Sequence, residues 1–141
     1  MSARSWLWAF LTTTPEIVNL IGGEDDPRVF AKKTMTSSVE QCPYIVYKMG
    51  YSAPEGLSET EDASRQFAQV WIHDYSDGKT ADYAKIDEVV EAIKSAIKLQ
   101  NSAEDAIILA RYLETSQDLN DETLNTVFRY VRIQIILKEE A

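Results

Sequence analysis

Two stretches of the chain carry strongly periodic hydrophobic patterns. Between Ala81 and Leu99, apolar residues recur at spacings of three and four, which places them on one side of an α-helix. This stripe consists of Tyr83, Ile86, Val89, Val90, Ile93, Ala96 and Ile97. Between Val127 and Leu137, apolar side chains alternate with polar and aromatic ones, which is the period of a β-strand with one apolar face. The apolar set is Val127, Val131, Ile133, Ile135 and Leu137, and the alternating set is Phe128, Tyr130, Arg132, Gln134 and Lys138.

The N-terminal region predicts helix followed by turn. Arg4–Leu11 has the pattern of a short amphipathic helix. Thr14–Pro15 predicts a second helical start, because threonine can cap a helix and proline suits its first position. Gly22–Gly23 should end that turn, because glycine commonly follows the last helical residue.

Four further segments predict strands, namely Val29–Phe30, Tyr44–Met49, Arg65–Tyr75 and Ile107–Thr115. In the third, Phe67, Gln69, Trp71, His73 and Tyr75 share one face, and Ala68, Val70 and Ile72 share the other. Neither face is fully polar, so we expect both to be at least partly covered. In the fourth, Ile107, Leu109 and Leu113 are expected to face one way.

Polar segments separate these elements. Lys32–Gln41, Asp77–Gly78, Asn101–Asp105 and Gln117–Glu122 are interpreted as loops or turns. Gly50–Ser64 is predicted to be a long exposed loop, because it has little to bury and carries several carboxylates. These carboxylates are Glu55, Glu59, Glu61 and Asp62.

The order of elements predicts a single α+β domain over residues 1–141, with an exposed loop at about 50–64. We expect a mainly antiparallel sheet of four or slightly more strands, with helices packed on one face. The other face would carry tyrosine, phenylalanine, arginine, glutamine and lysine. Such a mixture is typical of a sheet that faces water or a partner.

The charge narrows the classes of partner. There are 14 Lys and Arg against 23 Asp and Glu, a net charge of −9, so phosphates and anionic membranes should repel the chain. The charge has two interpretations, solubility or proximity to DNA that must pass without sticking. The single cysteine, Cys42, excludes an intrachain disulfide and fits a reducing cytoplasm. Met1–Thr14 has one basic residue and no small-residue cleavage site, so we expect no signal peptide.

The residues that carry chemistry are sparse, and we expect no catalytic site, cofactor or metal. His73 is the only histidine and is interpreted as a surface or boundary strand residue. Cys42 is interpreted as a buried or loop thiol, and one His with one Cys cannot make a closed zinc site. Asp118–Glu122 lacks the central glycine and the distant glutamate of a calcium loop. Arg129 and Arg132 should point to opposite faces of their strand, which leaves no basic stripe for nucleic acid.

The order of several sequence phrases resembles the tail-terminator, or tail-completion, proteins of bacteriophages with long non-contractile tails. These phrases are Glu16–Gly23, Arg28–Phe30, Cys42–Tyr47, Phe67–Ser76, Asp82–Ala96 and Arg132–Ile135. The resemblance covers about Glu16 to Leu137 and depends on pattern, with no catalytic residues involved. The loop Gly50–Ser64 is less typical of that family.

The resemblance implies a virion protein at the junction of tail and head, assembled in the host cytoplasm. Its copies would form a ring, usually of six subunits, that caps the tail tube and ends tube polymerisation at the correct length. The ring would offer a surface to the head-completion or connector protein. DNA would pass through its lumen without specific binding, and no membrane would be involved.

Two groups of residues are candidates for contacts within that assembly. We expect Glu55, Glu59, Glu61 and Asp62 to line the lumen or the tube-facing rim, and the alternative is an ordinary solvated loop. We expect Trp6, Trp8 and Phe10 to pack at a subunit boundary, and the alternative is core packing with one exposed ring. Trp6 and Phe10 share a helix face, whereas Trp8 should point elsewhere.

Three other functions remain open at the level of sequence. A head–tail connector or neck adaptor, one layer above the terminator, would use the same physical contacts with a different partner. A small intracellular hydrolase or ligand-binding domain would need a pocket with converging polar groups. A DNA-mimicking inhibitor would need clustered carboxylates, whereas here they scatter among lysines.

Overall fold

The computed structural model describes residues 3–23, 25, 27–31, 43–54, 63–75, 83–101, 108–121 and 126–138. Its helices are α1 (Ala3–Thr13), α2 (Pro15–Val18) and α3 (Ala84–Asn101). Its strands are β1 (Val29–Ala31), β2 (Tyr44–Pro54), β3 (Ala63–Tyr75), β4 (Ile108–Thr115), β5 (Leu119–Asp121) and β6 (Thr126–Lys138). The two periodic patterns of the sequence therefore correspond to α3 and β6, as predicted.

Among the described residues, six strands form one sheet in the order β1-β2-β3-β6-β4, and β5 pairs with β6 beside β4. Only the β1–β2 pair is parallel, and every other pair is antiparallel. The prediction of a mixed fold with a mostly antiparallel sheet is confirmed. The short strand at Val29–Phe30 was also predicted, and it becomes the edge strand β1.

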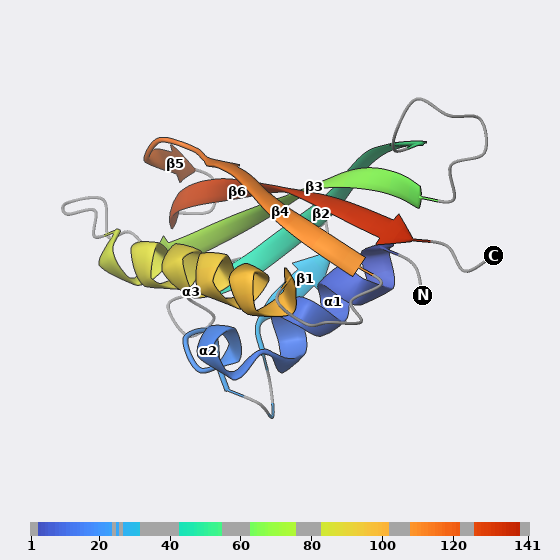
Figure 1. Cartoon of the computed structure of the whole chain (residues 1–141). Helices are drawn as coiled ribbons and strands as arrows, with labels where there is room; N and C mark the ends of the chain where they lie inside the picture. The colour runs from blue at the N-terminus through green and yellow to red at the C-terminus, as the bar shows by residue number, and fades with distance from the viewer. Residues whose placement is uncertain are drawn as a thin grey trace.

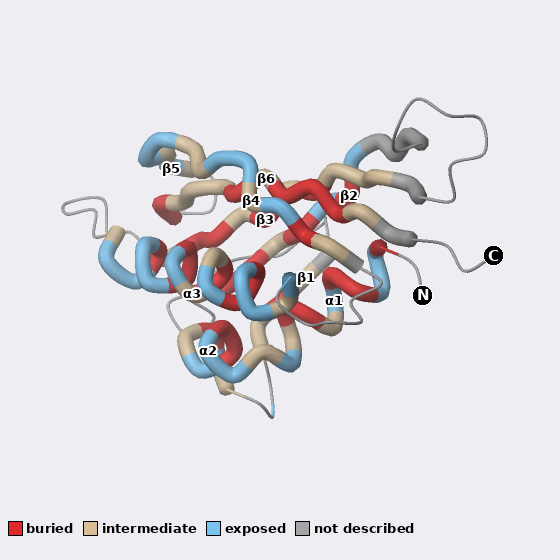
Figure 2. The backbone as a smooth tube through the Cα atoms, in the orientation of Figure 1, coloured by how far each residue is buried: buried red, intermediate tan, exposed pale blue. Residues whose placement is uncertain are grey.

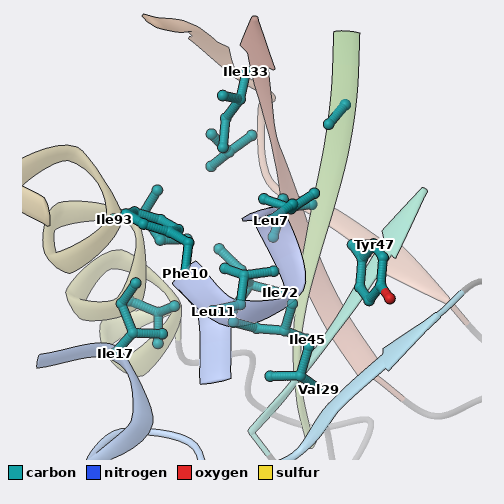
Figure 3. Packing of buried hydrophobic residues seen from close by; sticks show 14 of the residues in the cluster. Leu7, Phe10, Leu11, Ile17, Val29, Ile45, Tyr47, Ile72, Ile93 and Ile133 are labelled. Carbon is teal, nitrogen blue, oxygen red and sulfur yellow. The ribbon is translucent and has the colours of Figure 1, made fainter. Parts of the chain in front are cut away.

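The helices all lie on one side of this sheet (Figure 1). Buried residues concentrate where α1 and α3 meet the strands, and exposed residues follow the outer side of α3 (Figure 2). Figure 3 shows Leu7 and Leu11 from α1 beside Ile45 and Ile72 from the sheet. All four of these side chains are fully buried. The burial of Leu7, Leu11 and Ile72 agrees with the apolar faces predicted for Arg4–Leu11 and Arg65–Tyr75.

The connection after α1 differs in detail from the prediction. Thr14 stands at the N-cap before α2, but its side chain makes no capping hydrogen bond, because its hydroxyl donates to the carbonyl oxygen of Phe10 in the preceding helix. Gly22 and Gly23 end the turn with φ of 122° and 91°, a conformation that favours glycine. The N–H of Gly23 donates to the carbonyl of Val18 at 2.7 Å, which satisfies one of the last helical acceptors.

The prediction of a loop over Gly50–Ser64 is wrong at both ends. β2 continues to Pro54 and β3 begins at Ala63, so the two strands form a longer hairpin. The register shifts between Met49 and Ser52, and pairing then continues to Pro54 opposite Ser64. Local sequence disfavours a strand here, but β3 is also paired with β6 as far as Ala63, and this partner supplies backbone hydrogen bonds. Residues 55–62 lie outside the described residues.

Two predictions near the C-terminal half also need correction. The turn predicted at Gln117–Glu122 contains β5, which pairs with β6 from Leu119 to Asp121. In β4, Ala110 and Tyr112 pair with the buried Ile135 and Ile133 and therefore face the helices. The sequence predicted that Ile107, Leu109 and Leu113 face one way. Leu109 pairs with Ile136, a register shift between Tyr112 and Glu114 leaves Leu113 without a pairing partner in β6 and 37% exposed, and Ile107 lies outside the described residues.

Arg129 and Arg132 point to opposite faces of β6, as predicted. On the helix side, Arg129 Nη1 donates to Asp87 Oδ1 of α3 at 2.7 Å, and Nε donates to the carbonyl of Ser116 at 3.0 Å. On the other side, Arg132 Nη1 donates to Glu114 Oε1 at 3.1 Å. Arg129 thus joins α3, β6 and the segment after β4, whereas Arg132 makes one exposed cross-strand pair.

Replacing Arg129 with methionine should lower the free energy of unfolding by about 1–3 kcal/mol, because charge-assisted hydrogen bonds to two segments are lost. Urea denaturation monitored by circular dichroism measures the change. Arg132→Met is the matched control and should cost about 0–1 kcal/mol, because its single ion pair is exposed. Equal losses in the two variants would contradict this assignment.

Candidate assembly surfaces

The side of the sheet away from the helices, here called the outer face, is rich in aromatic residues. Strand register places Tyr44 of β2 opposite His73 of β3, and His73 opposite Phe128 of β6. The three rings stack across the strands, with centroids 4.9 Å apart at each step. Phe30 of β1 meets Tyr44 edge-on at 6.1 Å, which extends the row to the edge of the sheet.

His73 is buried in this row, although the sequence suggested a surface or boundary position. Its side chain is 6% exposed, and Nδ1 lies 2.9 Å from the hydroxyl of Thr126. Burial lowers the pKa of His73 from 6.5 to about 4, against the opposing effect of the Asp121 carboxylate. The imidazole is therefore neutral at pH 7. Its neighbours are the rings of Tyr44 and Phe128, the Thr126 hydroxyl and the Asp121 carboxylate, so the imidazole packs as part of the aromatic row.

The remainder of the outer face is half-buried. Trp71 and Tyr130 lie side by side with centroids 6.4 Å apart, and the Arg65 guanidinium lies 6.0 Å from the Phe67 ring centroid. Tyr75, at the end of β3, is 43% exposed. Aromatic rings with arginine and few carboxylates are the residue types that protein interfaces favour. No helix among the described residues covers this face, so the outer face is a candidate contact surface (Figure 1).

One edge of the sheet is formed by β1 and by the part of β2 that extends beyond it. β1 pairs with β2 only from Ile45 to Tyr47. Within the described ranges no strand pairs with the other side of β1, or with that side of β2 from Lys48 to Pro54. Trp8 of α1 lies at this edge, 6.2 Å from the ring of Tyr47, and is 45% exposed. This surface, the β1–β2 edge with Trp8, carries an exposed aromatic ring beside strand positions that no described strand pairs.

The opposite edge is β4, and a groove runs between it and α3. The larger part of the groove has a volume of about 610 Å³, and its lining includes the apolar residues Ile97, Leu109 and Ile136. Its cationic residues are Lys94, Lys98 and Arg111. A second part of about 490 Å³ shares Glu91, Lys94 and Tyr112 with the first and reaches Arg129. Lys94 Nζ lies 4.7 Å from the centroid of the Tyr112 ring and 3.4 Å from Glu91 Oε1.

The structure separates the three aromatic residues that were predicted at a subunit boundary. Trp6 and Phe10 are each 7% exposed and stack on one another at 4.9 Å, within the core of the chain itself. Only Trp8 presents a large exposed ring, and it points away from that pair, as the helical spacing predicted. Of these three residues, Trp8 alone remains a candidate for the contact between subunits. The carboxylates Glu55, Glu59, Glu61 and Asp62 lie outside the described residues, as does Cys42.

Two features of these surfaces had weak signals in the sequence or none. The aromatic composition of the outer face was visible as an alternating pattern, but its stacking depends on the register of three strands. Asn101 was assigned to a polar break, whereas it ends α3 and its side chain bonds Ala110 of β4. Nothing in the local sequence indicated that contact.

Neither a metal site nor a membrane-spanning helix is found among the described residues. It contains no group of three His, Cys, Asp or Glu residues placed to hold a metal ion. None of its helices combines the length and apolar character needed to cross a membrane. No protein-family model matches the sequence, and no curated protein matches it.

Proposed function

We propose that this chain is the subunit of a ring, with six copies as the expected number, that caps a phage tail tube. The ring ends tube polymerisation and provides the surface to which the head-completion or connector protein binds. The observation that carries the proposal is the outer face, a half-buried aromatic surface that no helix covers in the part of the chain that the structure describes. The order of sequence phrases described above supports the same assignment.

The two sheet edges support a ring in particular. The β1–β2 edge with Trp8 and the β4 edge with its groove differ from one another and lie at opposite ends of the strand order. A contact between two different surfaces of identical chains is head-to-tail, and it closes into a ring when the rotation per subunit permits. Identical surfaces would instead favour a closed dimer.

The charge supports passage of DNA without binding. A net charge of −9 gives phosphates few cations with which to exchange their counterions. Among the cationic residues on the outer face and in the groove, Arg132 and Lys94 are already paired with Glu114 and Glu91. DNA in the lumen of the ring is therefore expected to slide, and no sequence-specific contact is required.

Two alternatives lead to different experiments. A neck adaptor one layer above the terminator would use the same surfaces, and cryo-electron microscopy of virions would place the chain away from the tube end. A small ligand-binding domain would use the groove, whose volume of about 610 Å³ is in the usual range for ligands. The basic side chains of this groove lie beside apolar residues and along an edge of β4 that no described strand pairs. Such a surface suits a protein segment better than a metabolite.

Deletion of the gene tests the proposal directly. Virions lacking this chain should have tails of irregular length and unattached heads, as seen by negative-stain electron microscopy. Supplying the chain in trans should restore uniform tails and head attachment. Tails of normal length with heads attached, in the absence of the chain, would refute the proposal.

The acidic segment provides a separate prediction. Replacing Glu55, Glu59, Glu61 and Asp62 together with lysine adds eight units of positive charge to a chain of net charge −9. If these residues line the lumen or the tube-facing rim, phage yield should fall by at least about tenfold, because cations retain phosphates or disturb docking. Replacing the same residues with glutamine is the control, and it should reduce the yield less. Unchanged yield and tail length in the lysine variant would favour a solvated loop.

A further inference from the structure

The side chain of Asn101 bonds both backbone groups of Ala110 on the side of β4 that no described strand pairs. Its Nδ2 donates to the carbonyl oxygen of Ala110 at 2.6 Å, and the N–H of Ala110 donates to its Oδ1 at 2.9 Å. In an antiparallel sheet, a residue directs both backbone groups to the same side. Ala110 therefore turns its N–H and C=O away from β6, toward the side of β4 that no described strand pairs. The donor and acceptor that meet it there come from one side-chain amide.

This contact lies within the groove between α3 and β4. Asn101 and Ala110 both line the larger part of that groove, together with Arg111 and Lys98. Asn101 is the last residue of α3, where residues are less constrained than in the middle of a helix. The amide can leave Ala110 without disturbing the packed stripe of α3, whose buried residues end at Ile97.

We propose that the side-chain amide of Asn101 takes the place of a backbone peptide group beside β4. The β1–β2 edge of a second copy then displaces this amide and pairs with β4. This inference depends on the proposed ring, and it specifies how neighbouring copies join. A backbone segment of the second copy would take over both hydrogen bonds of Ala110. The side of β2 from Lys48 to Pro54 that faces away from β3 has no strand partner within the described residues, so it offers a matching edge.

The residues beside the two edges complement one another. Trp8 is 45% exposed at the β1–β2 edge. Lys98 and Arg111 stand at the groove beside β4 and can cover the face of an indole ring. Because the two surfaces lie at opposite ends of the strand order, one copy cannot fill its own groove with its own Trp8 edge. Until a second copy arrives, Asn101 protects an edge that would otherwise pair indiscriminately.

The test compares full-length variants by sedimentation velocity across a range of concentrations. Asn101→Ala leaves Ala110 without a competitor, so assembly should occur at roughly tenfold lower concentration than in the wild type. Asn101→Asp is the matched control: its carboxylate accepts from the Ala110 N–H but cannot donate to the Ala110 carbonyl. It should shift assembly less. Adding Ala110→Pro to Asn101→Ala removes the N–H and should abolish the gain.

A second measurement covers the case in which the proline variant does not fold. Hydrogen exchange at the Ala110 amide of Asn101→Ala should be slow in the assembled protein and fast after dilution to monomer. Equal assembly of Asn101→Ala and wild type, aggregates of unlimited size, or equal exchange at both concentrations would each overturn the inference. If rings form equally well with any residue at position 101, this inference fails, whereas the proposed ring function stands. A monomer in every variant at every concentration would refute both.

Discussion

Alanine at Trp6 should lower the free energy of unfolding by about 3–5 kcal/mol, whereas alanine at Trp8 should cost about 1 kcal/mol and prevent assembly. The two variants should differ because Trp6 and Trp8 lie on the same helix but are buried to different extents. Trp6 is 7% exposed and stacks on Phe10, so truncation leaves a cavity in the core. Trp8 is 45% exposed and touches the sheet through Tyr47, so much of its surface is free for a neighbouring copy.

Thermal or urea denaturation measures the first effect, and sedimentation velocity measures the second. The Trp8→Ala chain should remain a folded monomer at concentrations where the wild type assembles. Trp8→Phe keeps an aromatic ring and should retain part of the assembly. Rings that persist in Trp8→Ala would exclude Trp8 from the boundary, and an equal loss of stability in both variants would contradict the burial described here.

Acid should destabilise the fold through His73. The pKa of His73 is about 4 in the folded chain and 6.5 when unfolded, so the unfolded chain binds the additional proton between these values. The stabilising contribution is complete above pH 6.5 and is lost as pH falls toward 4. It amounts to about 3 kcal/mol, at 1.36 kcal/mol for each unit of pKa. The groups facing the imidazole are Tyr44, Phe128, Thr126 and Asp121, and only the last can offset its charge.

The matched variant for this prediction is His73→Phe, which keeps a ring between Tyr44 and Phe128 but has no titrating group. Urea denaturation at pH 7 and pH 4 should show a smaller loss in the variant than in the wild type, by about 3 kcal/mol. Carboxylates titrate in the same range, but they are common to both proteins and cancel in the comparison. An equal loss in both proteins would mean that His73 is not buried as described.

The sequence predicted the parts of the fold that depend on local periodicity. The stripe from Tyr83 to Ile97 and the alternation from Val127 onward each identified one face of an element, and burial follows both. These patterns are reliable because a helix or strand with one covered side repeats its apolar residues at the period of the backbone. The separation of Trp8 from Trp6 and Phe10 followed from the same reasoning.

The sequence did not predict features that depend on contacts between distant segments. The extension of β2 to Pro54 requires β3 and β6 as neighbours, because glycine, serine and proline disfavour strands locally. β5 is short and polar, and only its pairing with β6 makes it a strand. The burial of His73 results from the rings of two adjacent strands. The bond between Asn101 and Ala110 similarly requires α3 to end beside β4.

Two edges of the sheet that no described strand pairs, the β1–β2 edge and the β4 edge, are inferred to meet between copies of the same chain and to close a ring. Native mass measurement of the purified protein, from micromolar to millimolar concentration, tests this inference most directly. A closed species of six times the 16.0 kDa of one chain is expected, with no larger oligomers in the series. A chain that stays monomeric over the whole range, or one that grows without limit, would contradict it.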